Sequence, residues 1–126
     1  MGDFNQKELE LFAIKMLEDY DNKNPSSIFK KKINLSNNDA LFIQSRVTKL
    51  RIDRGEKVIG YKIGCIAQET QKKMGFNQPA WGTLWKKELY QNGVELNKKD
   101  YSNPAMEAEF GITLNRNIDP KLVTPE

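Results

Sequence analysis

The stretch Val58-Ile59-Gly60-Tyr61-Lys62-Ile63-Gly64 decides the organisation of the chain, because helical patterns end before it and strand patterns follow it. Its β-branched and aromatic residues are typical of a strand, and its apolar run predicts a buried one. Alternation along a strand places Lys62 on the same face as Gly60 and Gly64. The two glycines would let a ligand approach the backbone and the ammonium together, although a lysine pointing to water from an edge strand fits the same spacing.

Two amphipathic helices are predicted upstream of this strand. Apolar residues recur at three- and four-residue steps over residues 8–20, and Asn5 with Glu8 forms a capping-box pattern before them. The apolar stripe is expected to be wide, since it contains Leu9, Leu11, Phe12, Ile14, Met16, Leu17 and Tyr20.

The second helix is predicted over residues 39–53. Ser36 with Asp39 can cap its beginning, and Gly55 stands where a left-handed C-terminal cap belongs. Its core-facing stripe contains Ala40, Ile43, Val47 and Leu50.

Mainly strand patterns follow Gly64. Residues 67–74 predict a short helix that ends at Gly75, and residues 81–85 predict a strand that contains two tryptophans. Asn92-Gly93 predicts a hairpin turn between strands at 89–90 and 94–96. The order of helices first and strands second favours an α+β fold, with a helical N-terminal part followed by a mixed β-sheet.

Residues 106–114 show the clearest alternation in the chain and predict a further strand. Glu107 and Glu109 would share one face, with Cα atoms about 6.6–6.8 Å apart along the strand. Two carboxylates on one face are ligands that Mg²⁺ or Mn²⁺ prefers, and Gly111 leaves space beside them. An ordinary solvent-exposed face with two glutamates would give the same spacing.

Composition excludes several classes of function. The 126 residues suffice for one domain, and the net charge of +3 is weak for a nucleic-acid-binding protein, so Lys30, Lys31 and Lys32 are expected to be solvated. The chain contains no histidine, which removes imidazole catalysis and His-ligated zinc. With Cys65 alone there is no internal disulfide, and neither a signal peptide nor a membrane-length apolar run is evident, so we expect a cytoplasmic protein that binds no membrane.

Four segments in order resemble one known family. They are Gly60-Tyr-Lys-Ile-Gly64, Gln71 with Met74-Gly75, Gln78-Pro-Ala-Trp-Gly-Thr-Leu84, and Pro104-Ala-Met-Glu-Ala-Glu-Phe110. Together they resemble the 2-keto-4-pentenoate hydratases of the fumarylacetoacetate-hydrolase superfamily, and the resemblance extends over about residues 39–124.

The resemblance implies a lyase of aromatic catabolism that hydrates a 2-hydroxy-2,4-dienoate, a small 2-oxo acid, with Mg²⁺ or Mn²⁺. Lys62 matches the family's catalytic lysine, and Glu107 and Glu109 match its first two metal carboxylates. It further implies a helical region over residues 1–66, ending in the glycine-flanked strand, and an incomplete β-rich metal-site region over residues 67–126. The latter would be the truncated start of a fumarylacetoacetate-hydrolase-like β-roll.

Two departures from the family pattern keep other functions open. Ala80 stands where hydratases often carry an aspartate with an acid–base role, and a decarboxylase-like homologue is the alternative. Family members are also longer, and their third metal carboxylate lies beyond Glu126, so residues 123–126 are expected to start a further segment. A non-catalytic fragment that pairs with a separate C-terminal half, or a homo-oligomer, fits this second departure.

Overall fold

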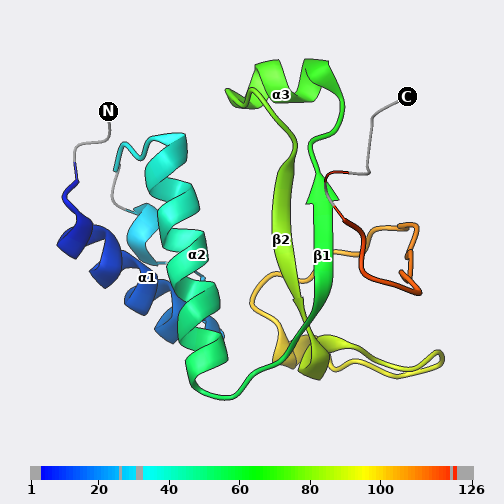
Figure 1. Ribbon diagram of the computed structural model, residues 1–126. Helices are drawn as coiled ribbons and strands as arrows, with labels where there is room; N and C mark the ends of the chain where they lie inside the picture. Colours follow the sequence, from blue (N-terminus) through cyan, green and yellow to red (C-terminus); the bar gives the residue numbers. More distant parts are fainter. Residues whose placement is uncertain (1–3, 26, 31–32, 120, 122–126) are drawn as a thin grey trace.

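The computed structural model describes residues 4–25, 27–30, 33–119 and 121. Over these residues it contains three α-helices and one two-stranded antiparallel sheet, which confirms the α+β class (Figure 1). The elements are α1 (Gln6–Asp21), α2 (Asn37–Asp53), β1 (Val58–Gly64), α3 (Gln68–Met74), β2 (Ala80–Trp85) and the short 3-10 helices η1 (Ser27–Lys30), η2 (Lys86–Glu88) and η3 (Lys98–Asp100).

Local capping signals define both long helices, as predicted. The Asn5 side chain accepts a hydrogen bond from the Glu8 backbone N–H at 3.1 Å, and the Glu8 carboxylate accepts one from Asn5 N–H at 2.8 Å. Ser36 and Asp39 form the same capping box at the beginning of α2. Gly55 has a φ of 94° just after α2, a conformation that glycine adopts without steric cost.

The hydrophobic core lies between α1 and α2, which run side by side (Figure 1). Leu9, Ala13 and Ile43 form its buried centre. Around them pack partly buried apolar residues: Phe4, Phe12, Met16, Leu35, Phe42 and Val47. The wide stripe predicted for the first helix is wrong at Leu11, Ile14 and Tyr20, which are exposed, because α2 covers only one face of α1.

The sheet is an antiparallel pair in which α3 connects the two strands. Lys62 pairs with Gly82 and Gly64 pairs with Ala80. The strand predicted at Val58–Gly64 is confirmed, but its predicted burial is wrong: Tyr61 and Ile63 are 65% and 63% exposed. Two strands form no mixed sheet, and the helices cover too little of this one to bury its residues.

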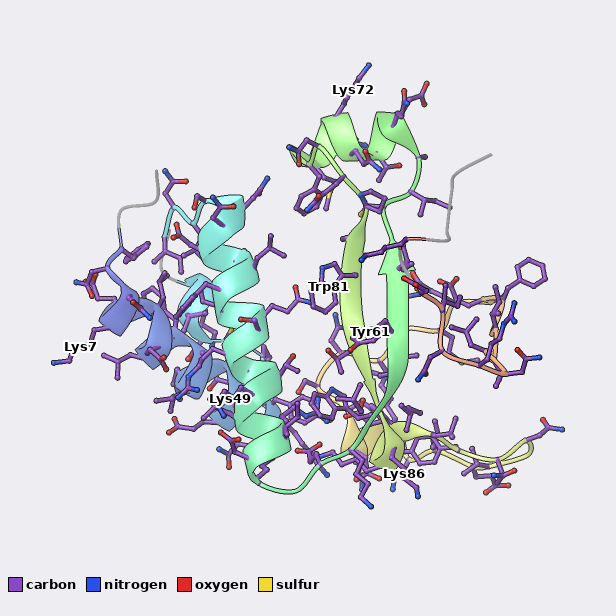
Figure 2. All side chains as sticks on the ribbon, viewed as in Figure 1. Lys7, Lys49, Tyr61, Lys72, Trp81 and Lys86 are labelled. Carbon is purple, nitrogen blue, oxygen red and sulfur yellow. The ribbon has the colours of Figure 1, made fainter. Side chains whose placement is uncertain are left out.

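A line of polar side chains on α2 joins the helices to β2. Gln44 donates a hydrogen bond from Nε2 to the Trp81 carbonyl oxygen at 2.7 Å, and the hydroxyl oxygens of Thr48 and Thr83 lie 3.4 Å apart. Figure 2 shows Trp81 on the side of the hairpin that faces α2. The contact continues at Arg51, one helical turn after Thr48.

Arg51 is the centre of a buried cluster where α1, α2 and the end of β2 meet. Its guanidinium carbon lies 4.0 Å from the centre of the Trp85 ring and 4.8 Å from that of Tyr20. Its Nη2 is 2.7 Å from a Glu56 carboxylate oxygen and 2.5 Å from one of Glu88. A buried charge is tolerated where it is paired in this way, so the cluster fixes the hairpin against the helices.

Two predicted β regions contain no strand in the structure. Around Asn92-Gly93 only the turn is formed, with Gly93 at a φ of 84°, and residues 89–90 and 94–96 are not strands. Residues 106–114 are irregular as well. A strand needs a ladder of hydrogen bonds to a partner backbone, and the strand pairing found among the described residues involves neither segment.

Some predictions fall outside the described residues, namely those for Lys31, Lys32 and residues 123–126. Within the described part of the chain, no helix combines the length and the apolar character that crossing a membrane requires.

Truncating the core should destabilise the fold far more than truncating a surface residue. We expect Ile43→Ala to lower the free energy of unfolding by about 2–4 kcal/mol, because it leaves a cavity between α1 and α2. Urea denaturation followed by circular dichroism measures the loss. Leu11→Ala is the matched control on an exposed face and should change stability by less than about 0.5 kcal/mol; equal losses in the two variants would contradict the placement of the core.

The Glu56 ion pairs should make stability depend on acidic pH. Burial raises the pKa of the Glu56 carboxyl, but hydrogen bonds from Arg51, Lys87 and Arg54 outweigh this and lower the pKa from its ordinary 4.5 to about 2. The contribution of Glu56 is therefore complete above about pH 4.5 and is lost as the pH falls toward 2. Urea midpoints between pH 5 and pH 2.5 should fall less steeply in Glu56→Gln than in the wild type.

The exposed Glu95→Gln serves as the control and should keep the wild-type slope. The urea midpoint of Glu56→Gln should still fall somewhat with pH, because Asp19 also contributes to the pH dependence. The backbone N–H of Ser27 donates a hydrogen bond to the Asp19 carboxylate and lowers its pKa to about 2. An unchanged slope in Glu56→Gln would contradict the assignment.

Candidate metal and substrate site

The three residues predicted as site residues come together in the structure. Lys62 lies in the middle of β1, and its Nζ is 3.3 Å from a Glu107 carboxylate oxygen. It also donates a hydrogen bond to the Glu109 carboxylate. The glutamates belong to the segment beside β1 in Figure 1, more than 40 residues further along the chain. The two sequence signals therefore fall in one cluster of charged side chains.

Most residues on the face of the sheet around Lys62 are small. Gly60 and Gly64 flank Lys62 on its strand, and the pairing register adds Gly82 and Ala80 from β2 to the same face, together with the larger Leu84 opposite Gly60. An added Cβ at Gly64 or Gly82 would meet nothing within 4 Å. Sequence reasoning identified the flanking glycines but missed Gly82 and Ala80, because the register of β2 could not be derived from the pattern.

The electrostatics of the site are set by one ammonium and two carboxylates. All three side chains are accessible to water, and Glu109 first and Glu107 second raise the pKa of Lys62 by hydrogen bonding. The ammonium is thus protonated at neutral pH and holds together two carboxylates that would otherwise repel each other.

The metal-ligating capacity of the site is limited to these two glutamates. The residues that the structure describes contain no group of three or more His, Cys, Asp or Glu side chains arranged to hold an ion. Two carboxylates suffice for a weakly held Mg²⁺ that keeps waters and accepts substrate oxygens, so the donor set fits a hard divalent ion.

The end of β1 is fixed by the side chain of Gln71 on α3. Its Nε2 donates to the carbonyl oxygens of Cys65 and Ile66 at 2.8 and 3.3 Å. Cys65 is partly buried and has a φ of 53°, a left-handed conformation that is uncommon for a residue other than glycine. Gln71 therefore stabilises the turn that leads out of the strand carrying Lys62.

The opposite face of the hairpin is apolar. Tyr61 and Trp81, labelled in Figure 2, pack edge to face with ring centres 5.8 Å apart. Together with Ile63, Pro79 and Ala80 they line a shallow groove. The sheet separates this groove from Lys62, because alternate residues of β1 point to opposite sides. Trp85 is core, as expected for a tryptophan, whereas Trp81 is 44% exposed.

Comparison with known proteins identifies several relatives. No protein-family model matches the chain. The 2-keto-4-pentenoate hydratase of Paraburkholderia xenovorans is 33% identical over 86 residues, which are 68% of this chain and 32% of that protein. A 4-oxalocrotonate decarboxylase of a Pseudomonas species is 29% identical over 87 residues, 69% of this chain and 34% of the relative.

Solved structures show the same fold in part. The 4-oxalocrotonate decarboxylase from Pseudomonas putida G7, complexed with calcium and acetate or with magnesium and adipate, superimposes with a TM-score of 0.58 at 17% identity. The match covers 69% of this chain and 34% of the decarboxylase chain. The chain thus spans about a third of the length of the proteins that it matches, and over that third it is a member of the 2-keto-4-pentenoate hydratase family.

Proposed function

We propose that this chain supplies part of the active site of a metal-assisted hydratase that adds water to a 2-hydroxy-2,4-dienoate during the breakdown of aromatic compounds. The names of the relatives support the reaction class. Because those relatives are about three times as long as the matched region, the complete reaction requires polypeptide beyond the matched part.

The observation that carries the proposal is the approach of Lys62 to Glu107 and Glu109 on an uncrowded face of the hairpin. Lys62 and the two glutamates come from distant parts of the sequence, and they meet beside three glycines and Ala80. Such an arrangement leaves room for a small anionic ligand. A purely structural ion pair would not require that room.

Glu107 and Glu109 would hold the divalent ion, in line with the calcium and magnesium in the decarboxylase complexes. When bound, the ion would polarise the 2-oxo group and stabilise negative charge in the dienolate. Its arrival would compete with the Lys62 ammonium for the same carboxylate oxygens.

Lys62 would act as a cationic hydrogen-bond donor. An ammonium has N–H donors and no lone pair, which suits stabilisation of a developing oxyanion or donation of a proton and does not suit a general base. The group that activates water must then lie elsewhere, since Ala80 on the same face has no ionisable side chain.

A decarboxylase-like reaction is the second candidate, and Ala80 favours it. Decarboxylation of a 2-oxo acid needs an electrophile near the oxo group but no residue to activate water. The 4-oxalocrotonate decarboxylases among the relatives and structural neighbours support this alternative. Either reaction implies a small 2-oxo acid as the substrate, and we place it in the cytoplasm of a cell that degrades aromatic compounds.

Metal binding should require both glutamates and should be opposed by Lys62. We expect the chain to bind Mn²⁺ with a Kd on the order of 10⁻⁴–10⁻³ M, as sites with few charged ligands do. Water-proton relaxation measures this binding. Glu107→Gln/Glu109→Gln should abolish it, and Lys62→Met should tighten it several-fold because the competing ammonium is gone.

The matched control for metal binding is Glu69→Gln/Glu95→Gln, which removes two exposed carboxylates elsewhere and should leave the Kd unchanged. Equal binding by the site variant and this control would show that the ion binds the surface non-specifically. Weaker binding by Lys62→Met would contradict the competition.

Activity should depend on Lys62 once the rest of the fold is present. The suitable protein is a chimera in which residues 1–126 replace the corresponding part of the Paraburkholderia xenovorans hydratase. With Mg²⁺ and 2-hydroxypenta-2,4-dienoate, we expect Lys62→Ala to lower kcat by about 10²–10⁴-fold, the range for loss of a general acid. Ala80→Asp should raise hydration, whereas release of CO₂ from 4-oxalocrotonate without hydration would favour the decarboxylase. Full activity of Lys62→Ala would refute the role of the lysine.

A further inference from the structure

Helix α3 is held in place by polar contacts rather than by packing. The structure describes all seven of its residues; none of them is buried, and Gln71 alone is not exposed. The N-cap residue, Ala67, makes no side-chain capping bond, and a helix this short has little stability of its own. Its C-terminal end is joined to α2 by a hydrogen bond of 3.2 Å from Asn37 to the Gly75 carbonyl oxygen. At its other end, the contacts of Gln71 hold it against the hairpin.

The contacts of Gln71 lie at the point where β1 ends and α3 begins, beyond the paired strands in Figure 1. Its amide nitrogen donates to two successive carbonyl oxygens, those of Cys65 at 2.8 Å and Ile66 at 3.3 Å. Cys65 has a φ of 53°, a conformation that is sterically costly for a residue with a Cβ atom. Both bonds depend on the direction of these carbonyls, so they stabilise the turn against the extended backbone that Cys65 would otherwise prefer.

The turn at Cys65 controls the end of the strand that carries Lys62. Gly64 directly precedes Cys65 and forms the last pair of the sheet with Ala80. If Cys65 became extended, the chain would leave β1 in another direction, and the pair at Gly64 would be the first to open. Lys62 lies only two residues from this end, and the glycines beside it have no side chains that could hold it in place. The direction of the Lys62 side chain therefore depends on the turn.

We propose that Gln71 is a positioning residue for Lys62. By holding Cys65 in the left-handed conformation, it keeps the end of β1 paired and the Lys62 ammonium against the carboxylates of Glu107 and Glu109. The importance of this contact for catalysis rests on the proposed function. The contact itself can be measured without metal or substrate.

Competitive acylation of the lysines tests the proposal. The 126-residue chain is treated in EDTA with a limiting amount of N-hydroxysuccinimidyl acetate, and labelling is read at each lysine by mass spectrometry. An ammonium paired with carboxylates reacts slowly, because only the free amine is a nucleophile. Gln71→Met keeps the length of the side chain but removes both donors, and it should raise labelling of Lys62 about three-fold, a size that exposed ion pairs allow. The control Gln68→Met, at an exposed position of the same helix, should leave it unchanged.

A second substitution at the turn separates positioning from general loosening. Cys65→Gly/Gln71→Met should return the labelling of Lys62 close to that of the wild type, because glycine adopts the left-handed conformation without steric cost. Cys65→Ser/Gln71→Met, which keeps a Cβ atom there, should stay at the raised value. In Glu107→Gln/Glu109→Gln the ammonium has already lost its partners, so adding Gln71→Met should cause no further rise.

Lys15 provides the internal reference for folding, since its Nζ lies 3.0 Å from an Asp19 carboxylate oxygen within α1. A rise at Lys15 as large as that at Lys62 would show that the whole fold has loosened and would overturn the proposal. Unchanged labelling of Lys62 in Gln71→Met, or failure of Cys65→Gly to restore it, would overturn it as well. Full activity of Lys62→Ala in the chimera would refute the catalytic role of the lysine, and it would leave the labelling result as it stands.

Discussion

The packing of the Arg51 guanidinium against Trp85 is the contact on which the arrangement of this molecule depends. The hydrophobic core holds the two long helices together but does not extend to the hairpin. The hairpin is joined to the helices through α2, by a line of polar contacts that begins at Gln44 and ends at Arg51. Of these contacts only Arg51 is buried, and Glu56 and Glu88 neutralise its charge there. The orientation of β1, and with it that of Lys62, follows from this cluster.

The hairpin separates two environments. The side toward α2 carries Tyr61, Ile63 and Trp81, and the other side presents Lys62 among glycines. One face of β1 therefore contributes apolar side chains, and the other face contributes the charged Lys62. The carboxylates that complete the polar side come from a segment with no regular structure of its own, so the site is only as well ordered as that segment.

Sequence reasoning succeeded where the signal is local. The capping boxes at Asn5 and Ser36, the left-handed glycines after α2 and α3, and the strand around Lys62 all arise from neighbouring residues, and the structure contains each of them. It failed where strand formation needs a distant partner: residues 106–114 do alternate, but no strand of the described residues pairs with them. For the site, residue types and family resemblance selected Lys62, Glu107 and Glu109. Their mutual contact depends on where the irregular segment 106–114 lies, and the face of small residues depends on the register of β2; no local sequence pattern encodes either.

Because residues 106–114 are attached to β1 through side chains that remain open to water, dissolved ions compete with that attachment. The Debye length shrinks from about 30 Å at 0.01 M ionic strength to about 10 Å at 0.1 M. Exposed ion pairs weaken over the same range, whereas the buried Arg51 pairs are shielded from it. Raising the ionic strength should therefore weaken the attachment of residues 106–114 to β1. The Arg51 contacts between the helices and the hairpin should remain. The buffer in which the chain is studied therefore decides how often Glu107 and Glu109 are available to another cation.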